Sequence, residues 1–193
     1  MLNAEELFHL GLHSLEKDDV GESLSLFKRC VEMDEHHAKA TYMVGALYAQ
    51  IQMLEPAIDW LQKAIELDAS EKTAVFQLGL LHLTSGDVEE SATVWRELDD
   101  LKPDHPFKLF SAGMTALVKD DFALCIEKLS QGIENNDFNT ALNDDMRRVI
   151  ASAEAAMENR PGEAVVEHGE VTPNAASAQR ALSGYKQSLK GNG

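Results

Sequence analysis

A glycine recurs in this chain at a constant interval of 34 residues, and its four occurrences are Gly11, Gly45, Gly79 and Gly113. A fixed period of this length is typical of stacked helix pairs, in which each unit buries its apolar faces against its neighbours. The period therefore predicts an open all-α array. Arrays of this kind present a surface to other chains and seldom carry catalytic chemistry, so the pattern favours binding over catalysis.

The residues around each glycine have the spacing of two amphipathic helices. When each unit is counted from seven residues before its glycine, apolar or small residues predominate at positions 4, 7 and 11 and again at 17, 20, 24 and 27, which is the helical period. Position 20 is small in every unit. Position 24 is bulky in every unit, at Phe27, Leu61, Trp95 and Leu129. Turn-forming pairs separate the two helices in three units, at Asp18-Asp19, Gly86-Asp87 and Asp120-Asp121.

Over residues 4–137 this pattern resembles the tetratricopeptide repeat (TPR) family. The matching motifs are Leu10-Gly11, Val44-Gly45-x-x-Tyr48, Leu78-Gly79, Ala57-x-x-x-Leu61-x-x-Ala64 and Pro103. The family's first aromatic residue is replaced by Leu7, Thr41, Val75 and Leu109. The resemblance implies an all-α fold, a right-handed α-solenoid of four helix-turn-helix (TPR) repeats with a C-terminal capping helix and a flexible tail.

The repeat register predicts the organisation of the chain. Residues 1–159 form the array, with repeats at 4–37, 38–71, 72–105 and 106–139 and a capping helix at about 139–159. The capping helix is predicted from one apolar stripe, Leu142, Met146, Val149, Ile150, Ala153 and Met157.

Residues 160–193 are rich in glycine and proline and predict a flexible tail. Within the tail, apolar residues at helical spacing around Arg180, Lys186 and Lys190 predict a short basic amphipathic helix at 175–189, marginal alone in water and helical when docked. Self-docking of this segment on the acidic array is one hypothesis, and a mobile tail is the other.

The net charge of −16 at neutral pH comes from the array. Acidic residues cluster on the predicted second helices, at Glu22, Glu32, Asp59, Glu66, Glu89, Glu90, Glu97 and Glu127. We interpret them as a solvated outer face, with steering of a basic partner as the alternative. A nucleic-acid partner is not expected, because phosphate binding needs a basic patch. No apolar run reaches the ~20 residues of a membrane span. The polar N-terminus does not resemble a signal peptide, so a cytoplasmic location is expected.

In TPR proteins the first helices line a concave groove, and the resemblance implies a peptide-binding groove here. The candidate residues are Phe8, Leu12, Tyr42, Phe76, Leu80, Phe110 and Met114. The first helices are apolar on nearly every side, which calls for cover beyond the neighbouring repeat. The alternative is that the aromatic rings only fill the gaps between adjacent first helices. The cationic clamp of chaperone-tail-binding repeats is missing, since its positions hold Phe8, Leu12, Met43, Thr73 and Gln77. The size and apolar groove instead resemble secretion chaperones that hold hydrophobic segments.

Motifs for chemistry are weak. His9 and His13, with Glu5 one turn earlier, have a spacing that could hold a metal, but solvated side chains are the simpler interpretation. Cys30 and Cys125 are expected to be small, reduced core residues. The chain has no phosphate-binding loop, nucleophile elbow or Cys-x-x-Cys motif. We therefore expect no cofactor, no metal and no enzymatic activity.

Three functions remain open. The first is a protein-interaction scaffold, chaperone- or assembly-factor-like, whose concave groove binds a protein or peptide with an apolar or basic amphipathic segment. The second is a structural or assembly protein that forms a homodimer through the groove or an end face. The third is an unrecognised metal-binding or enzymatic protein.

Overall fold

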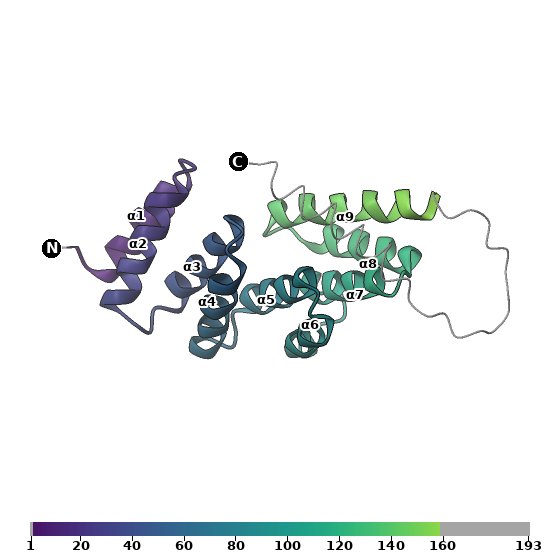
Figure 1. Cartoon of the computed structure of the whole chain (residues 1–193), viewed down its shortest axis with the longest axis horizontal. Coiled ribbons are helices and arrows are strands. Elements are labelled where there is room, and N and C mark those ends of the chain that lie inside the picture. Colours follow the sequence, from purple (N-terminus) through teal and green to yellow (C-terminus); the bar gives the residue numbers. More distant parts are fainter. Residues whose placement is uncertain (1, 159–193) are drawn as a thin grey trace. The chain divides into compact units, whose positions relative to one another are not determined.

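The computed structural model describes residues 2–158, and all regular secondary structure in that stretch is helical (Figure 1). The chain divides into two compact units, Met1–Glu97 and Leu98–Gly193, which are described separately. Between residues 2 and 158, no helix combines the length and the apolar character needed to cross a bilayer. The predicted all-α array of helical repeats is confirmed. The first unit holds α1 (Ala4–Leu15), α2 (Val20–Met33), α3 (Ala38–Gln50), α4 (Leu54–Leu67), α5 (Lys72–Ser85) and α6 (Val88–Trp95), and the second holds α7 (Pro106–Val118), α8 (Phe122–Asn135) and α9 (Thr140–Glu158). A short 3-10 turn, Arg96–Leu98, follows α6.

Each first helix begins at a side chain that accepts a hydrogen bond from the backbone of its first turn. These capping residues are themselves 34 residues apart, at Asn3, His37, Glu71, His105 and Asn139. Such a cap satisfies a backbone N–H that the helix leaves without a partner. The period therefore sets the start of each hairpin as well as its packing.

The turn inside each hairpin requires one residue with left-handed backbone geometry. This residue is Asp18 (φ 58°), Gln52 (φ 63°), Gly86 (φ 101°) or Asp120 (φ 57°). The next residue occupies the N-cap of the second helix. Asp19 and Asp121 accept hydrogen bonds there, whereas Asp87 makes no side-chain cap. The predicted turns are present in repeats 1, 3 and 4. Repeat 2 makes the same turn with Gln52-Met53, although Met53 provides no side-chain cap.

The recurring glycine is the contact point between the two helices of a hairpin. A Cβ atom added at Gly11 would lie 2.6 Å from the ring of Phe27, sixteen positions later. The same clash would occur in the other three repeats, between Gly45 and Leu61, Gly79 and Trp95, and Gly113 and Leu129. Glycine at position 8 is therefore what allows the bulky residue at position 24 to seat against the first helix.

Neighbouring hairpins share their cores. In the first unit, Phe27 on α2 belongs to one buried cluster with Val44 on α3, and Leu61 on α4 belongs to another with Leu78 on α5. In the second unit, α9 packs on α8. It buries Asn143, Met146, Val149 and Ala153, while Leu142 and Ile150 are half-buried and Met157 is exposed. The tail, 160–193, and its helix at 175–189 lie outside the described residues.

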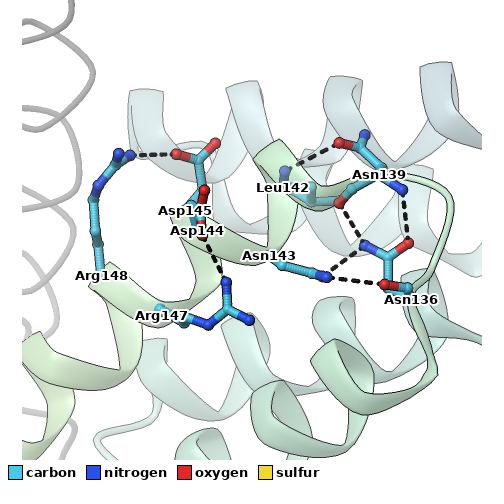
Figure 2. Close-up of polar contacts among 8 residues, drawn as sticks. All are labelled: Asn136, Asn139, Leu142, Asn143, Asp144, Asp145, Arg147 and Arg148. Atoms are coloured by element: carbon cyan, nitrogen blue, oxygen red, sulfur yellow. Dashed lines mark hydrogen bonds and ion pairs between the residues drawn. The ribbon is translucent and has the colours of Figure 1, made fainter.

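A buried amide network joins α8 to α9 (Figure 2). The Asn136 side-chain amide donates to the Asn143 side-chain oxygen at 2.7 Å, and the Asn143 amide donates back to the Asn136 carbonyl at 2.9 Å. The Asn136 amide also donates to the Asn139 carbonyl at 2.8 Å. The network satisfies polar groups that would otherwise be buried without partners, and so fixes the angle at which α9 leaves the loop.

Candidate functional site

Most of the predicted groove residues are interior residues. Phe76, Phe110 and Met114 are completely buried, and Phe8 and Leu80 expose less than a tenth of their surface. Leu12 and Tyr42 are half-buried. Ligand binding at the seven positions stays a prediction, but five of them offer little surface to a ligand in this conformation.

Two of the buried aromatic rings contact a ring on the second helix of their own hairpin, and Phe8 also lies 4.8 Å from the ring of His37. The ring centroids of Phe8 and Phe27 lie 5.5 Å apart, and Phe76 stacks on Trp95 at 5.9 Å with an interplanar angle of 13°. The Trp95 indole N–H also donates to the Phe76 carbonyl at 3.1 Å. The contacts with Phe27 and Trp95 lie between the two helices of one hairpin, whereas the packing alternative placed the rings between adjacent first helices. Replacing such rings with alanine would damage the core as well as any groove.

A smaller apolar surface remains on α1 and α3, the first helices of repeats 1 and 2. We call it the first-helix surface, and it consists of half-buried residues of α1 and α3: Leu12, Leu15, Tyr42, Ala46 and Ala49. These residues occupy positions 5, 9 and 12 of repeats 1 and 2. The corresponding residues of repeat 3, Phe76, Leu80 and Leu83, are buried. The first-helix surface is therefore confined to repeats 1 and 2.

The Tyr42 hydroxyl is the polar group of this surface. Burial, together with the negative charge of Glu71, raises the pKa of the Tyr42 phenol to about 12, against the opposing effect of a hydrogen bond with Gln77. The phenol is therefore neutral at physiological pH. A neutral hydroxyl can both donate and accept a hydrogen bond, so it has the chemistry to bond to a polar backbone group.

The surface beyond these residues is acidic. The eight carboxylate residues predicted on the second helices are all exposed: Glu22, Glu32, Asp59, Glu66, Glu89, Glu90, Glu97 and Glu127. Their exposure is what a solvated outer face requires. It also leaves them free to attract a basic partner.

A hollow of about 350 Å³ lies along α2 and is lined by Gly21, Leu24, Ser25, Lys28, Arg29 and Glu32. All six residues come from one helix, and the set includes none of the predicted groove positions. With two cations and one carboxylate, it has neither the apolar lining nor the depth expected of a small-molecule site.

The histidines predicted as metal-ligand candidates contact neighbouring carboxylates. The Glu5 carboxylate lies 3.2 Å from His9 Nε2 and 3.4 Å from His37 Nε2, and His13 pairs with Glu16 at 3.3 Å. The Ala40 N–H donates to His37 Nδ1, so Nε2 of neutral His37 carries the proton that faces Glu5. Within residues 2–158, no three His, Cys, Asp or Glu side chains form a group that could hold a metal ion.

The two cysteines are inert core residues. Both side chains are completely buried and carry free thiols. Burial raises the pKa of Cys30 to about 11, with the nearby Asp34 and Glu5 carboxylates adding to the effect, and raises the pKa of Cys125 to about 12. Because the thiolate is the reactive form, these thiols are not nucleophiles at neutral pH.

Comparisons with known proteins agree with this architecture. Residues 38–71 match the family model described as "Tetratricopeptide repeat". A 58-residue stretch, 28% of the chain, is 36% identical to the general transcriptional corepressor CYC8 of Saccharomyces cerevisiae, of which it covers 6%. Among solved structures, TTC0263, a thermophilic TPR protein of Thermus thermophilus, has a TM-score of 0.65 at 14% identity, covering 97% of this chain and 90% of that one. YrrB, a TPR protein titled as having an unusual peptide-binding site, has a TM-score of 0.57 at 15% identity, covering 98% and 88%. These structural similarities establish the fold.

Proposed function

We propose that this tetratricopeptide-repeat protein is a non-enzymatic protein-interaction scaffold that binds an apolar or amphipathic peptide segment on its first-helix surface. The observation that carries the proposal is the partial exposure of Leu12, Leu15 and Tyr42 at positions whose counterparts in repeat 3 are buried. The solved structure of YrrB is described as having a peptide-binding site, and this supports the proposal because the same fold can hold a peptide there.

The chemistry of the surface defines the ligand we expect. Apolar side chains of the peptide would cover Leu12, Leu15 and Ala46, gaining about 25 cal/mol for each Å² of apolar surface removed from water. The Tyr42 hydroxyl would bond to a backbone group of the peptide. Lysine or arginine residues flanking the apolar ones would be favoured, because the chain carries a net charge of −16.

The test uses the full chain and three sets of fluorescent synthetic peptides, which are basic amphipathic, acidic amphipathic and uncharged apolar. Anisotropy titrations should show the tightest binding for the basic amphipathic set. Ala46→Glu places a charge at the centre of the first-helix surface and should weaken binding by about tenfold or more, the equivalent of ~1.4 kcal/mol. Leu124→Glu, at an exposed residue of α8, is the control and should bind normally. Equal binding by the folded Ala46→Glu protein would refute the proposal.

One observation favours a second candidate, self-association through the N-terminal end of the array. Leu10 is 41% exposed, whereas Val44 and Leu78, at the same repeat position, are buried beneath the preceding hairpin. Leu2 is also 41% exposed. Sedimentation of the full chain would show a dimer that Leu10→Glu converts to a monomer, and a wild-type monomer at all concentrations would exclude this candidate.

A further inference from the structure

Among its described residues, the second unit displays one aromatic ring that its own core does not cover. Phe138, in the loop between α8 and α9, is 57% exposed. Its ring contacts Phe107 edge-on at a centroid distance of 5.5 Å and His105 at 6.3 Å. Phe107 is buried. Phe138 therefore forms the outer layer of a three-ring cluster and presents its remaining surface to solvent.

The exposure of Phe138 does not come from a loosely held loop. On either side of it, the Asn139 N–H donates to the Asn136 side-chain oxygen at 3.2 Å, and the Asn136 amide returns a bond to the Asn139 carbonyl (Figure 2). On the neighbouring segment, the Phe107 N–H donates to His105 Nδ1 at 3.2 Å. The cluster is thus a preformed platform, and a preformed site loses little entropy on binding.

The platform has an acidic rim. Asp137 immediately precedes Phe138, Asp104 immediately precedes His105, and both are exposed. The Asn135 side-chain amide donates to the Asp104 carbonyl at 3.1 Å, which brings the two segments together. Glu134 adds a further exposed carboxylate. A ring face beside carboxylates suits an apolar ligand that also carries a cation, because the ring quadrupole and the carboxylates both attract the positive charge.

A segment of this chain has that chemistry. Residues 175–189 contain no acidic residue and combine cations with large apolar side chains. The residues concerned are Arg180, Leu182, Tyr185, Lys186 and Leu189. The rest of the chain is strongly acidic, so the segment and the platform have complementary charge.

The connecting chain is long enough. Phe138 lies two residues before the start of α9, and α9 is 19 residues long, so a segment that follows α9 must return about 28 Å to reach it. Residues 159–174 separate α9 from the segment. Fully extended they could span up to about 55 Å, and as a flexible chain their r.m.s. span is about 20–24 Å. A linker whose span matches the distance gives an effective concentration near the millimolar range.

We propose that the Phe138 platform is the docking site of residues 175–189 of the same molecule. Leu182 and Tyr185 cover the exposed ring, and Arg180 and Lys186 lie against the carboxylates of Asp104 and Asp137. The C-terminal segment is thereby held on the second unit, and an external protein with the same basic and apolar chemistry would compete for the platform. This proposal is independent of the first-helix surface and of whatever binds there.

The experiment is paramagnetic relaxation on the full chain. Ser188→Cys provides one reactive thiol for a nitroxide label, because both native cysteines are buried. In the ¹⁵N-labelled protein, the backbone amide signals of His105 and of residues 137–139 should lose intensity, while those near Leu124 on α8 should not. Phe138→Ala should restore the lost signals, and so should Arg180→Glu with Lys186→Glu. Added salt should weaken the effect.

The proposal is overturned if the loss of intensity does not peak at His105 and residues 137–139, or if it survives Phe138→Ala in a protein of unchanged helicity. A mixed sample of ¹⁵N-labelled chain without nitroxide and unlabelled chain with nitroxide tests whether one molecule docks on another. Signal loss in that sample would overturn docking within the same molecule. Met157→Ala, at another exposed apolar residue of this unit, is the matched control and should leave the relaxation pattern unchanged.

Discussion

The turn of repeat 2 can be rebuilt with the residues that its own sister repeats use, and the change should stabilise the first unit. Gln52 occupies a left-handed conformation with φ 63°, where repeats 1 and 4 have aspartate and repeat 3 has glycine. Met53 occupies the cap of α4 at φ −88° and ψ 79°, and Asp19 occupies the cap of α2 at φ −85° and ψ 78°. The backbone is therefore already in the capping geometry, and we predict that Gln52→Gly with Met53→Asp stabilises the protein.

The magnitude follows from two contributions. A side chain other than glycine costs about 1–2 kcal/mol in the left-handed region, and about half of the gain from Gln52→Gly is offset by the greater freedom of glycine in the unfolded chain. A new aspartate cap contributes about 1 kcal/mol. In repeat 1, the Glu22 N–H donates to Asp19 at 3.0 Å, which is the bond that Met53→Asp would add to α4. Together the two changes should add about 1.5 kcal/mol to the free energy of unfolding.

Tryptophan fluorescence during urea unfolding measures this change, since both tryptophans, Trp60 and Trp95, lie in the first unit. With an m-value of about 1.5 kcal/mol/M, the midpoint should rise by about 1 M at constant m. The reciprocal variant Asp19→Met transfers the repeat 2 residue to repeat 1 and should lower the midpoint. An unchanged or lowered midpoint in the double variant would show that the left-handed conformation of Gln52 and the missing cap at Met53 do not reduce stability.

Three further outcomes are expected. Gly79→Ala forces a Cβ into the Trp95 ring and should destabilise the protein by about 1–3 kcal/mol or more. By contrast, a Cβ added at Gly21 would meet only the Asp19 Oδ1 atom, at an ordinary contact distance of 3.8 Å, so Gly21→Ala should be neutral or stabilising by ~0.5 kcal/mol in thermal unfolding. Asn143→Leu removes the side-chain oxygen that accepts the 2.7 Å hydrogen bond from the buried Asn136 amide, and should lower the free energy of unfolding by about 1–3 kcal/mol. The control Arg147→Ala removes an exposed ion pair and should change the free energy of unfolding by less than ~0.5 kcal/mol. Because the pKa values of Cys30 and Cys125 are raised from 9.0 to about 11 and about 12, the unfolded thiols ionise first. The thiol contribution to the free energy of unfolding should therefore stay constant below pH 9 and fall between pH 9 and 12. The fall should be less steep in a Cys125→Ala variant.

The period of the sequence was enough to predict the hairpins, because their defining contact is local. The glycine at position 8 and the bulky residue at position 24 lie in one hairpin and recur together, so the pattern of residue types carries the packing. The helix caps at position 34 recur with the same period. The caps are not recognisable as a repeat of one residue type, because asparagine, histidine and glutamate share only the ability to accept a hydrogen bond.

The candidate site was harder to predict for a physical reason. An aromatic residue at position 5 has the same sequence signature whether it faces a ligand or the second helix of its own hairpin. The outcome depends on the partner ring, and at Phe76 the Trp95 side chain provides both a stacking surface and a hydrogen bond. The Phe138 platform has no periodic signal, because its rings come from two loops and a helix start that only the folded chain brings together.

Arg147 sets a limit to growth of the array by duplication. It occupies position 8 of a fifth unit, where the four preceding units have glycine, and its exposed side chain pairs with Asp144. A second helix cannot approach α9 at Arg147 as α8 approaches α7 at Gly113, because a side chain now fills that space. A gene that gained one more hairpin after residue 158 would have to change this codon before the added helix could dock. A mutation of Arg147 to a small residue would therefore be the first step of any lengthening of this kind.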